Sequence, residues 1–300
     1  MSSNREFPFF SIIMPTYNRA NLILASIQTA IAQEYPHFEI IVVDDGSTDN
    51  TEEVIRSLNH PKVIYHKKKN EERAAARNTG TQLAQGDYVT FFDSDDYLYP
   101  YHLTEAIKLI EKHHRPEMIY LAYNVMDTDK KVIKEQKISP GTDFNKKLIG
   151  GNYLSCNGVF LRRDVALQHP FNTNRTLSAS EDYDLWLRLA ARYKIYYSDV
   201  ITSSILNHDA RSVFVVKEKP LTDRILLLKE TCTNDPLIRK FYKGKLDVFV
   251  SKCYLYLALH LAMSKYKKSA ISYFIKGIKQ HPLSIFDIRV YGIIKCLIIY

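Results

Sequence analysis

The sequence predicts an α/β protein whose central sheet is mostly parallel and carries helices on both faces. Apolar runs typical of buried strands alternate with amphipathic segments through the first hundred residues, and most of these runs end at polar clusters. A βαβαβαβ order of this kind predicts a doubly wound sheet with right-handed crossovers. The chain has 300 residues, 46% of them hydrophobic and 25% charged, so it has enough material for one large or two ordinary domains with a full core.

The elements expected in the first hundred residues follow one another closely. Residues 9–14 form a continuous apolar run that Pro15 ends, which is typical of a buried parallel strand. Residues 19–33 are helical, with one apolar stripe made of Leu22, Ile23, Ile27 and Ile31. Further strands are expected at residues 38–43, 62–66 and 88–92, and further helices at residues 50–58 and 71–84.

The second part of the chain is first mixed and then helical. Strands are expected at residues 118–125, 132–136 and 156–161, and a helix at residues 181–192 with Leu185, Trp186 and Leu189 facing inward. Residues 266–282 resemble a single tetratricopeptide helix pair, which cannot bury its own apolar face. We therefore predict two domains, residues 1–215 and an all-helical region at residues 216–300.

Charge and cysteine usage narrow the class of protein. The net charge of +8 favours an anionic partner, although a lysine-rich proteome explains the charge equally well. The four scattered cysteines predict reduced thiols and a cytoplasmic location. We identify no signal peptide and no run of about 20 apolar residues that would span a bilayer. The apolar residues 293–300 either dock on the fold or contact a membrane surface, which would place the protein at the inner face of a membrane.

The segment FFDSDD at residues 91–96 is the most informative part of the chain. An apolar strand runs directly into three carboxylates, although acidic residues disfavour strands and repel one another. A divalent cation that bridges a diphosphate explains the pattern, because hard oxygen ligands suit Mg²⁺ or Mn²⁺. The alternative interpretation is a solvated acidic turn.

Three further motifs precede this segment in order. They are SIIMPTYNR at residues 11–19, VVDDGSTD at residues 42–49 and ARNTG at residues 76–80. Ligands of doubly wound sheets bind beyond the carboxyl ends of the strands, where most of these polar residues fall. Together the four motifs resemble the family 2 glycosyltransferases, which have the GT-A nucleotide-diphospho-sugar fold. The resemblance covers roughly residues 9–212 and implies a Rossmann-like GT-A domain followed by the helical region.

The resemblance implies a nucleotide site at the ends of the first two strands. Tyr17 corresponds to a residue that stacks on the base, and Asp45 to one that accepts the N3–H of uracil, which favours a UDP-sugar donor. The alternative for Asp45 is a turn residue before Gly46. Thr16 corresponds to a residue that bonds the base or ribose, with Pro15 beside it in the motif. Asp44 either shares this role or only caps the loop.

The same resemblance assigns the diphosphate and the metal. Asp95 corresponds to a direct ligand of Mn²⁺ or Mg²⁺, and Asp93 to a residue near the ribose or a metal-bound water, with Ser94 between them. His208 is either a further metal ligand or a structural histidine. Arg77, in an alanine-rich helix, is expected to pair with a phosphate or with the acidic motif, the alternative being a solvated surface arginine.

Three further residues near these motifs have expected roles in the same site. Asp96 is expected to cap the turn that follows the acidic motif, and Arg211 to help hold the diphosphate. Arg73 lies one helical turn before Arg77 and is a further candidate for the same contact.

The segment SEDYDLW at residues 180–186 resembles the acceptor motif of the family. Asp182 would then be the catalytic base, Glu181 would orient the acceptor, and Trp186 belongs to the same acceptor or sugar site. Gly158 would allow the donor to approach closely. One base and in-line attack imply inversion at the anomeric carbon. The alternative for the acids is that they stabilise the N-terminus of the helix.

Three other functions agree less well with the sequence. A sugar nucleotidyltransferase usually has a glycine-rich loop after its first strand, and PTYNR at residues 15–19 contains no glycine. A non-catalytic nucleotide-sugar sensor or scaffold that acts through the C-terminal helices is disfavoured by the intact acids. Nucleic-acid binding is disfavoured because the lysine run at residues 67–69 is interpreted as a solvated turn. The Gln-x-x-Arg-Trp motif of the processive family members is not found, which favours transfer of single sugars or a short-chain polymerase. By analogy with the family, the acceptor is expected to be a saccharide or lipid-linked saccharide in polysaccharide or glycoconjugate synthesis.

Overall fold

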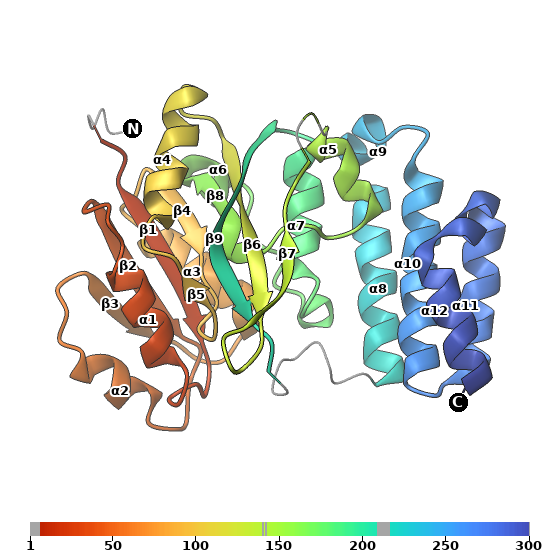
Figure 1. Cartoon of the computed structure of the whole chain (residues 1–300), viewed down its shortest axis with the longest axis horizontal. Coiled ribbons are helices and arrows are strands. Elements are labelled where there is room, and N and C mark those ends of the chain that lie inside the picture. The colour runs from red at the N-terminus through yellow and green to blue at the C-terminus, as the bar shows by residue number, and fades with distance from the viewer. Residues whose placement is uncertain (1–6, 140, 142, 209–216, 300) are drawn as a thin grey trace. The chain divides into compact units, whose positions relative to one another are not determined.

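The computed structural model describes residues 7–139, 141, 143–208 and 217–299 and confirms the predicted α/β class (Figure 1). Its contacts define two compact units, each discontinuous in sequence. The first unit comprises Met1–Phe144, Tyr153–Thr173 and Tyr193–His208, and the second comprises Asn145–Asn152, Asn174–Arg192 and Asp209–Tyr300. The division into domains at residues 215 and 216 stays a prediction.

The first unit begins with the predicted alternation of strands and helices. Its elements are β1 (Phe10–Thr16), α1 (Ile23–Ile31), β2 (Phe38–Asp44), α2 (Thr51–Ser57), β3 (Val63–Lys67), α3 (Glu72–Leu83) and β4 (Tyr88–Phe91). The four strands are parallel neighbours in the order β3-β2-β1-β4. Pro15 does not end β1 as predicted, because the ladder with β2 continues until Thr16 lies opposite Asp44.

The remaining strands extend the sheet in the order β8-β6-β9-β5, with β7 beside β6. The elements are β5 (Tyr97–Leu98), α4 (His102–Lys112), β6 (Met118–Met126), β7 (Val132–Gln136), η2 (Cys156–Gly158), β8 (Val159–Arg162), α6 (Arg163–Gln168) and β9 (Ile195–Leu206). The long β6–β9 ladder is parallel, whereas the short ladders of β5, β7 and β8 are antiparallel. Neither α4 nor β9 was among the predicted elements.

Alternate side chains of β1 supply both faces of the sheet. Phe10, Ile12 and Met14 belong to a buried cluster that includes apolar residues of α1 and α4. On the other face α3 packs closely, because Gly80 presents no side chain to Ile13: a Cβ on Gly80 would lie 2.3 Å from Ile13 Cγ2. The predicted placement of helices on both faces is therefore confirmed.

The second unit is helical. Its elements are α5 (Phe144–Lys147), which starts at the unit boundary, η1 (Leu148–Gly150), η3 (Arg175–Leu177), α7 (Glu181–Ala190), α8 (Glu218–Asn234), α9 (Pro236–Phe241), α10 (Leu246–Met263), α11 (Lys267–Gln280), η4 (Pro282–Phe286) and α12 (Ile288–Ile299). The inward side of α7 is as predicted, with Leu185, Trp186 and Leu189 buried. Helices α8, α11 and α12 all pack on α10.

Helix α10 differs from the expectation that no segment is long and apolar enough to span a membrane. It has 18 residues and a mean hydropathy of 1.3, which by length and composition alone suffices to cross a bilayer. The core helix of a soluble protein meets the same criteria, and 44% of this helix is buried. Its packing against α8, α11 and α12 gives it the environment of a core helix.

His102, at the start of α4, couples the stability of the first unit to pH. Its Nδ1 lies 2.8 Å from Thr202 Oγ1 of β9, and its ring packs on Phe160. Burial lowers the pKa of His102 from 6.5 to about 3. Between these values the unfolded chain binds a proton that the native state excludes. Native stability is therefore lost as the pH falls from about 6.5 towards 3.

We expect the His102→Asn variant, which keeps a polar group near Thr202, to lose part of this pH dependence. Its free energy of unfolding should fall less steeply on acidification than that of the wild type, by up to about 1.4 kcal/mol per pH unit. Urea unfolding of both proteins at several pH values between 7 and 5 measures the difference, and other titrating groups cancel in the comparison. Parallel pH profiles would contradict the assignment.

Candidate active site

The loops that follow β1 and β2 are tied together by hydrogen bonds. The Asp45 N–H donates to Thr16 O at 2.9 Å, and the Asn18 N–H donates to Ser47 Oγ at 2.9 Å. Asn18 adopts a left-handed backbone conformation with φ of 50°, which lets its Oδ1 accept the Thr48 N–H at 2.8 Å. These bonds hold residues 16–18, at the end of β1, against residues 45–48, which follow β2.

The predicted nucleotide-binding residues 15–17 lie at this end of β1. Tyr17 is 47% exposed, so the aromatic ring is available for contact with a ligand. The Thr16 hydroxyl is buried, and its Oγ1 has no hydrogen-bond partner among the described residues. Pro15 is buried in the ladder before it. A buried hydroxyl without a partner is costly, which marks Thr16 as a candidate ligand contact.

Asp44 has a structural role. Its Oδ1 accepts the Ser47 N–H at 2.7 Å, and its Oδ2 accepts the Tyr65 hydroxyl at 2.6 Å. Burial and the hydrogen bond to Asp44 raise the pKa of Tyr65, which keeps the phenol protonated as a donor. Of the two alternatives for Asp44, the structure therefore supports the capping role.

Asp45 is buried and anchors the start of α3. Its Oδ1 accepts the Glu71 N–H at 3.0 Å and Lys68 Nζ at 3.1 Å, and its Oδ2 accepts the Glu72 N–H at 2.8 Å. A carboxylate offers about four lone-pair positions, so these three bonds leave Oδ2 with room for one further donor. Glu72 is held at φ of +75°, a strained value for a residue with a side chain.

Within the lysine run at residues 67–69, which the sequence predicts to be a solvated turn, Lys68 is not solvated. Its side chain is only 12% exposed and pairs with both Asp45 and Glu71. Burial lowers the pKa of Lys68, but hydrogen bonds to Glu71 and Asp45 outweigh this effect and raise the pKa above its ordinary value. Lys68 therefore stays charged beside Asp45.

The acidic residues after β4 face separate cations. Arg77, which is 2% exposed, donates from Nη2 to Asp93 Oδ1 at 2.7 Å. Asp95 Oδ2 lies 3.4 Å from Arg19 Nη2 and 3.1 Å from His208 Nε2. The predicted pairing of Arg77 with the acidic motif is thus confirmed. His208 and Asp95, 113 residues apart in the chain, lie side by side.

Asn157 and Asp96 hold this loop in place. Asn157 Oδ1 accepts the Asp93 N–H at 3.1 Å, and its Nδ2 donates to Asp96 Oδ2 at 2.7 Å. Asp96 Oδ1 accepts the Leu206 N–H at 3.0 Å, which joins the loop to the end of β9. Asp96 and Asn157 are fully buried, and Ser94 is nearly so. The Asp96 carboxylate therefore links the loop to η2 and β9, and its predicted capping of the following turn stays a prediction.

Asp95 and His208 are suitable ligands for a divalent cation. Carboxylate and imidazole suit Mn²⁺, and Mg²⁺ usually combines one or two carboxylates with phosphate oxygens and water. Among the residues that the structure describes, no three His, Cys, Asp or Glu side chains form a metal-binding group. The donor set therefore fits an ion whose coordination a diphosphate completes. The guanidinium of Arg19 is a cation already in contact with Asp95. Arg211 lies outside the described residues.

The predicted acceptor residues belong to the second unit. Asp182 lies in the first turn of α7, where Oδ2 accepts a hydrogen bond from Asn152 Nδ2 at 2.9 Å and Oδ1 accepts the Tyr183 N–H at 2.7 Å. Each carboxylate oxygen thus accepts at least one hydrogen bond that orients it. Glu181 is 3% exposed and Trp186 is fully buried, so their predicted contacts with an acceptor stay predictions.

Gly158 in the first unit is explained by packing inside the sheet. A Cβ at this position would lie 2.2 Å from Leu121 O and 2.8 Å from Tyr120 Cε2, both in β6. Only glycine allows this close approach of η2 and β6. The predicted contact of Gly158 with the donor stays a prediction.

Four residues that organise the site have no role predicted from the sequence. Arg19 ends the first motif but has no predicted role, and Asn157, which precedes Gly158, is not among the predicted site residues. Lys68 and Tyr65 act through Asp45 and Asp44, which are distant in sequence. No local pattern marks such partners, because they pair across the fold.

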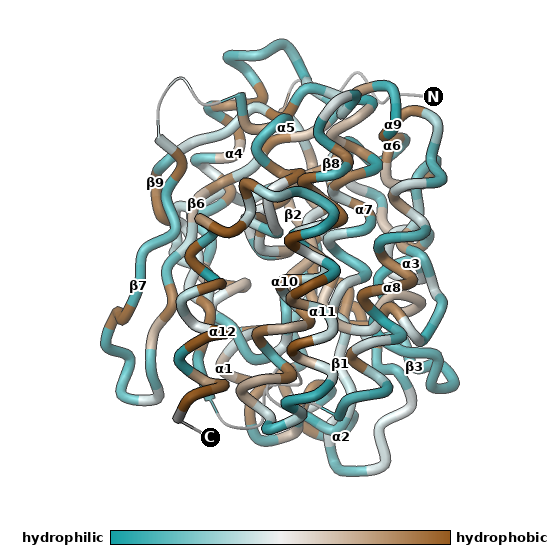
Figure 2. Tube along the Cα trace, turned by 90° about the vertical axis from the view of Figure 1, so that its right-hand side faces the viewer, coloured by the Kyte–Doolittle hydropathy of each residue, from teal (hydrophilic) through white to brown (hydrophobic). Residues whose placement is uncertain are grey.

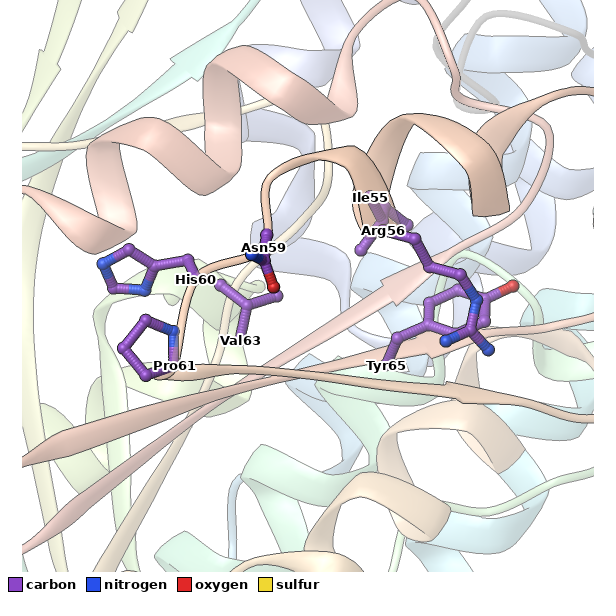
Figure 3. Close-up of a pocket in the computed structure, with 7 residues that line it drawn as sticks. All are labelled: Ile55, Arg56, Asn59, His60, Pro61, Val63 and Tyr65. Atoms are coloured by element: carbon purple, nitrogen blue, oxygen red, sulfur yellow. The ribbon is translucent and has the colours of Figure 1, made fainter.

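A pocket of about 370 Å³ lies beside α2 and β3 (Figure 3). Arg56, His60 and Tyr65 are among the residues that line it, and the Arg56 guanidinium lies 4.8 Å from the centre of the Tyr65 ring. The pocket contains none of the site residues predicted from the sequence. Tyr65 links the pocket to the site, because its hydroxyl donates to Asp44 Oδ2.

Comparison with known sequences identifies the family. The model of the family described as glycosyl transferase family 2 matches residues 11–168, more than half of the chain. Four curated relatives from Rickettsia species, each named an uncharacterized glycosyltransferase, are 28–30% identical over 65–88% of this chain. The chain spans 29–68% of their own lengths. Chondroitin synthase of Escherichia coli is 30% identical over 62% of this chain, and the match covers 27% of that protein.

Solved structures share the fold. S. aureus TarS 1-349 in complex with UDP-GlcNAc is 17% identical and aligns over 92% of each chain with a TM-score of 0.64. Mannosyltransferase PcManGT from Pyrobaculum calidifontis in complex with GDP-Man and Mn²⁺ is 18% identical and aligns over 97% of this chain and 85% of that one with a TM-score of 0.55. These likenesses agree with the predicted GT-A class. Together with the family match, they lead to one conclusion: the chain belongs to glycosyl transferase family 2 and is a glycosyltransferase.

Proposed function

We propose that the protein transfers a sugar from a UDP-sugar to an acceptor hydroxyl, with a divalent cation and with inversion at the anomeric carbon. The observation that carries the proposal is the meeting of Asp95 and His208 at 3.1 Å, next to the Arg77–Asp93 pair in the same acidic loop. This loop lies at the carboxyl end of β4, the edge of an α/β sheet where ligands bind. The UDP-GlcNAc named for TarS, and the GDP-Man and Mn²⁺ named for PcManGT, support a donor of this class.

The donor nucleotide is assigned to the loops after β1 and β2. The exposed Tyr17 ring would stack on the base, and the unpartnered Thr16 hydroxyl would bond the base or ribose. Asp45 Oδ2 has room for one more donor, and the N3–H of uracil is a donor of the required kind. A base that presents a lone pair at this position would be rejected, since two acceptors would face each other.

The proposed hydrogen bond between Asp45 and the uracil N3–H can be tested with a ligand that lacks this N–H group. N3-methyl-UDP lacks the proposed donor, so the wild-type protein should bind it at least tenfold less tightly than UDP. The Asp45→Asn variant should bind UDP more weakly and should discriminate less between the two ligands. Calorimetric titration of each pair measures the effect.

Lys68→Met is the matched control, because it removes the cation beside Asp45 but keeps the carboxylate and its backbone donors. It should retain the discrimination. An Asp45→Asn variant that still prefers UDP as strongly as the wild type would exclude Asp45 as the base-reading residue.

The diphosphate is assigned to the acidic loop. Asp95 and His208 would hold Mn²⁺ or Mg²⁺, which when bound neutralises charge on the departing diphosphate. Arg77 holds Asp93 in place and adds fixed positive charge next to the loop. Arg19 gives Asp95 a cationic partner that a bound metal would have to displace or share.

We expect Asp95→Asn to remove the gain in UDP affinity that Mn²⁺ produces, while binding without metal changes little. The reason is that an amide is a poorer ligand than a carboxylate for a hard divalent cation. Calorimetry of UDP binding with and without Mn²⁺ measures both quantities.

The Arg19→Gln variant serves as the control, since it removes the other partner of Asp95 without removing a proposed metal ligand. It should keep the gain that Mn²⁺ produces. If Asp95→Asn keeps this gain as well, Asp95 is not the ligand.

Asp182 is proposed as the general base. As the acceptor oxygen attacks the anomeric carbon, its proton passes to the Asp182 carboxylate. The bond between that carbon and the diphosphate oxygen breaks, and UDP leaves with the bonding electrons. Attack from the face opposite the leaving group inverts the configuration. The hydrogen bonds from Asn152 and from the Tyr183 N–H support this role, because they hold the carboxylate in one orientation.

We expect Asp182→Asn to lower the rate of sugar transfer by about 10²–10⁴-fold, the usual contribution of a general base, while UDP affinity stays within about twofold. Transfer assays with radiolabelled UDP-sugars and calorimetry supply the two readouts. Asp164→Asn, a matched change at a largely exposed carboxylate, should leave both unchanged. Parallel losses of binding and turnover in the Asp182 variant would argue for a structural role.

The acceptor is proposed to be a saccharide or lipid-linked saccharide in polysaccharide or glycoconjugate synthesis. The relationship to a chondroitin synthase supports a glycan product. Glu181 is proposed to orient the acceptor, with Trp186 in the wall behind it and Gly158 in the donor pocket. Glu181 and Trp186 lie in the same short helix as Asp182, which gives them a common support.

A further inference from the structure

The C-terminal end of the second unit exposes an unusual number of large apolar side chains. Phe286 is 85% exposed and Ile288 83% exposed, values at which a side chain has almost no protein neighbours. They belong to a set that we call the C-terminal apolar face, which consists of Leu283, Phe286, Ile288, Tyr291, Ile294 and Ile298. All six lie in η4 and α12, in one stretch of 16 residues, 283–298. Contiguous exposure of this kind usually marks an interaction site.

Helix α12 is apolar on two opposite sides, and only one of them is used within the unit. Val290 and Ile293 are buried against Leu255 and Ala258 of α10. Ile288, Tyr291 and Ile298 follow a helical spacing of three and seven residues, so they share the opposite side. Figure 2 shows the apolar colouring that continues to the end of α12. No described segment of the chain covers this side.

The charge of the segment that contains the face is predominantly positive. Residues 264–300 contain seven Lys and Arg and a single acidic residue, Asp287, a formal charge of +6 within a protein of net charge +8. The basic residues are Lys265, Lys267, Lys268, Lys276, Lys279, Arg289 and Lys295. Most of these lysines are exposed on α11, and Lys295 lies on α12. The positive charge of the whole protein is therefore concentrated at this end.

We propose that the C-terminal apolar face docks on the surface of an anionic lipid bilayer, with α12 lying in the interface. Exposed apolar side chains enter the boundary between headgroups and acyl chains, and the lysines attract acidic headgroups. The 12 residues of α12 extend about 18 Å, which is too short to cross a hydrocarbon core of about 30 Å. The helix is therefore a surface anchor.

Charge also decides against the main alternative occupant, a second copy of the chain. Two such faces brought together would bring together two C-terminal segments, residues 264–300, that each carry a formal charge of +6. An anionic bilayer instead complements both the charge and the apolar character of the face. The inference does not depend on the proposed function, since it concerns only η4, α11 and α12.

The experiment is flotation of the full-length protein with vesicles of two compositions, phosphatidylcholine alone and phosphatidylcholine mixed with phosphatidylglycerol. We expect the protein to float with the anionic vesicles and to partition at least tenfold less onto the neutral ones. About 0.5 M NaCl should remove most of the preference, because it screens the attraction of the lysines.

Two double variants separate the apolar and the electrostatic contributions to vesicle binding. Phe286→Ser combined with Ile288→Ser should lower partition onto anionic vesicles at least tenfold. Lys279→Gln combined with Lys295→Gln should lower it by about fivefold for each lysine. Ile133→Ser is the matched control, an isoleucine of β7 that is 53% exposed, and should bind vesicles as the wild type does. Circular dichroism and thermal unfolding establish that each variant is folded.

The outcomes decide the proposal. Failure of the folded wild-type protein to float with anionic vesicles overturns it, as does equal flotation of the wild type and the Phe286→Ser, Ile288→Ser protein. Light scattering addresses the second copy: a dimer that this double substitution dissociates would show that the face joins protomers instead.

Discussion

The buried carboxylate of Asp96 is the constraint on which the candidate donor site depends. It accepts hydrogen bonds from Asn157 Nδ2 and from the Leu206 N–H, and its backbone carbonyl accepts the Ser26 hydroxyl. These three donors come from η2, the end of β9 and α1, which are far apart in the chain. A buried carboxylate is costly unless its oxygens are satisfied, so this arrangement is strongly favoured over alternatives in which any of the three segments shifts.

The position of Asp96 determines what its neighbours can do. With the loop fixed, Asp93 and Asp95 lie close to cations on separate elements, Arg77 of α3 and Arg19 before α1. These pairs offset the repulsion between carboxylates that are two residues apart. They also mean that the charges are already oriented before a ligand arrives. A site preorganised in this way can stabilise a developing negative charge without first rearranging its own dipoles.

The sequence predicts the strands that carry this site better than it predicts the contacts between side chains that are distant in the chain. Apolar runs mark β1, β2 and β4, and the polar residues after them are correctly placed at strand ends because the side-chain pattern there is simple. Strand β9 was missed because its buried residues include Thr202, Ser203 and Ser204, which bond or pack inside the sheet and so break the apolar pattern. Its position beside β6 brings His208 to Asp95, and no local spacing encodes that encounter. The role of Lys68 was missed for the same reason, since its partner Asp45 lies on another strand end.

Helix α7, which carries Asp182, is held in part by the C-terminal helices, although the sequence suggests that they form a separate region. Asp184 of α7 accepts hydrogen bonds from Arg188 and from the Thr231 hydroxyl of α8. The Tyr242 hydroxyl, just after α9, donates to Asn145 O at 2.5 Å, and Asn145 Nδ2 donates to Ala190 O at 2.8 Å. A chain cut at residue 215 would lose the partners from α8 and α9 and would leave Asp184 with one donor fewer inside the unit. The helical region is therefore better understood as the scaffold of α7, and hence of the proposed base, than as an appended module.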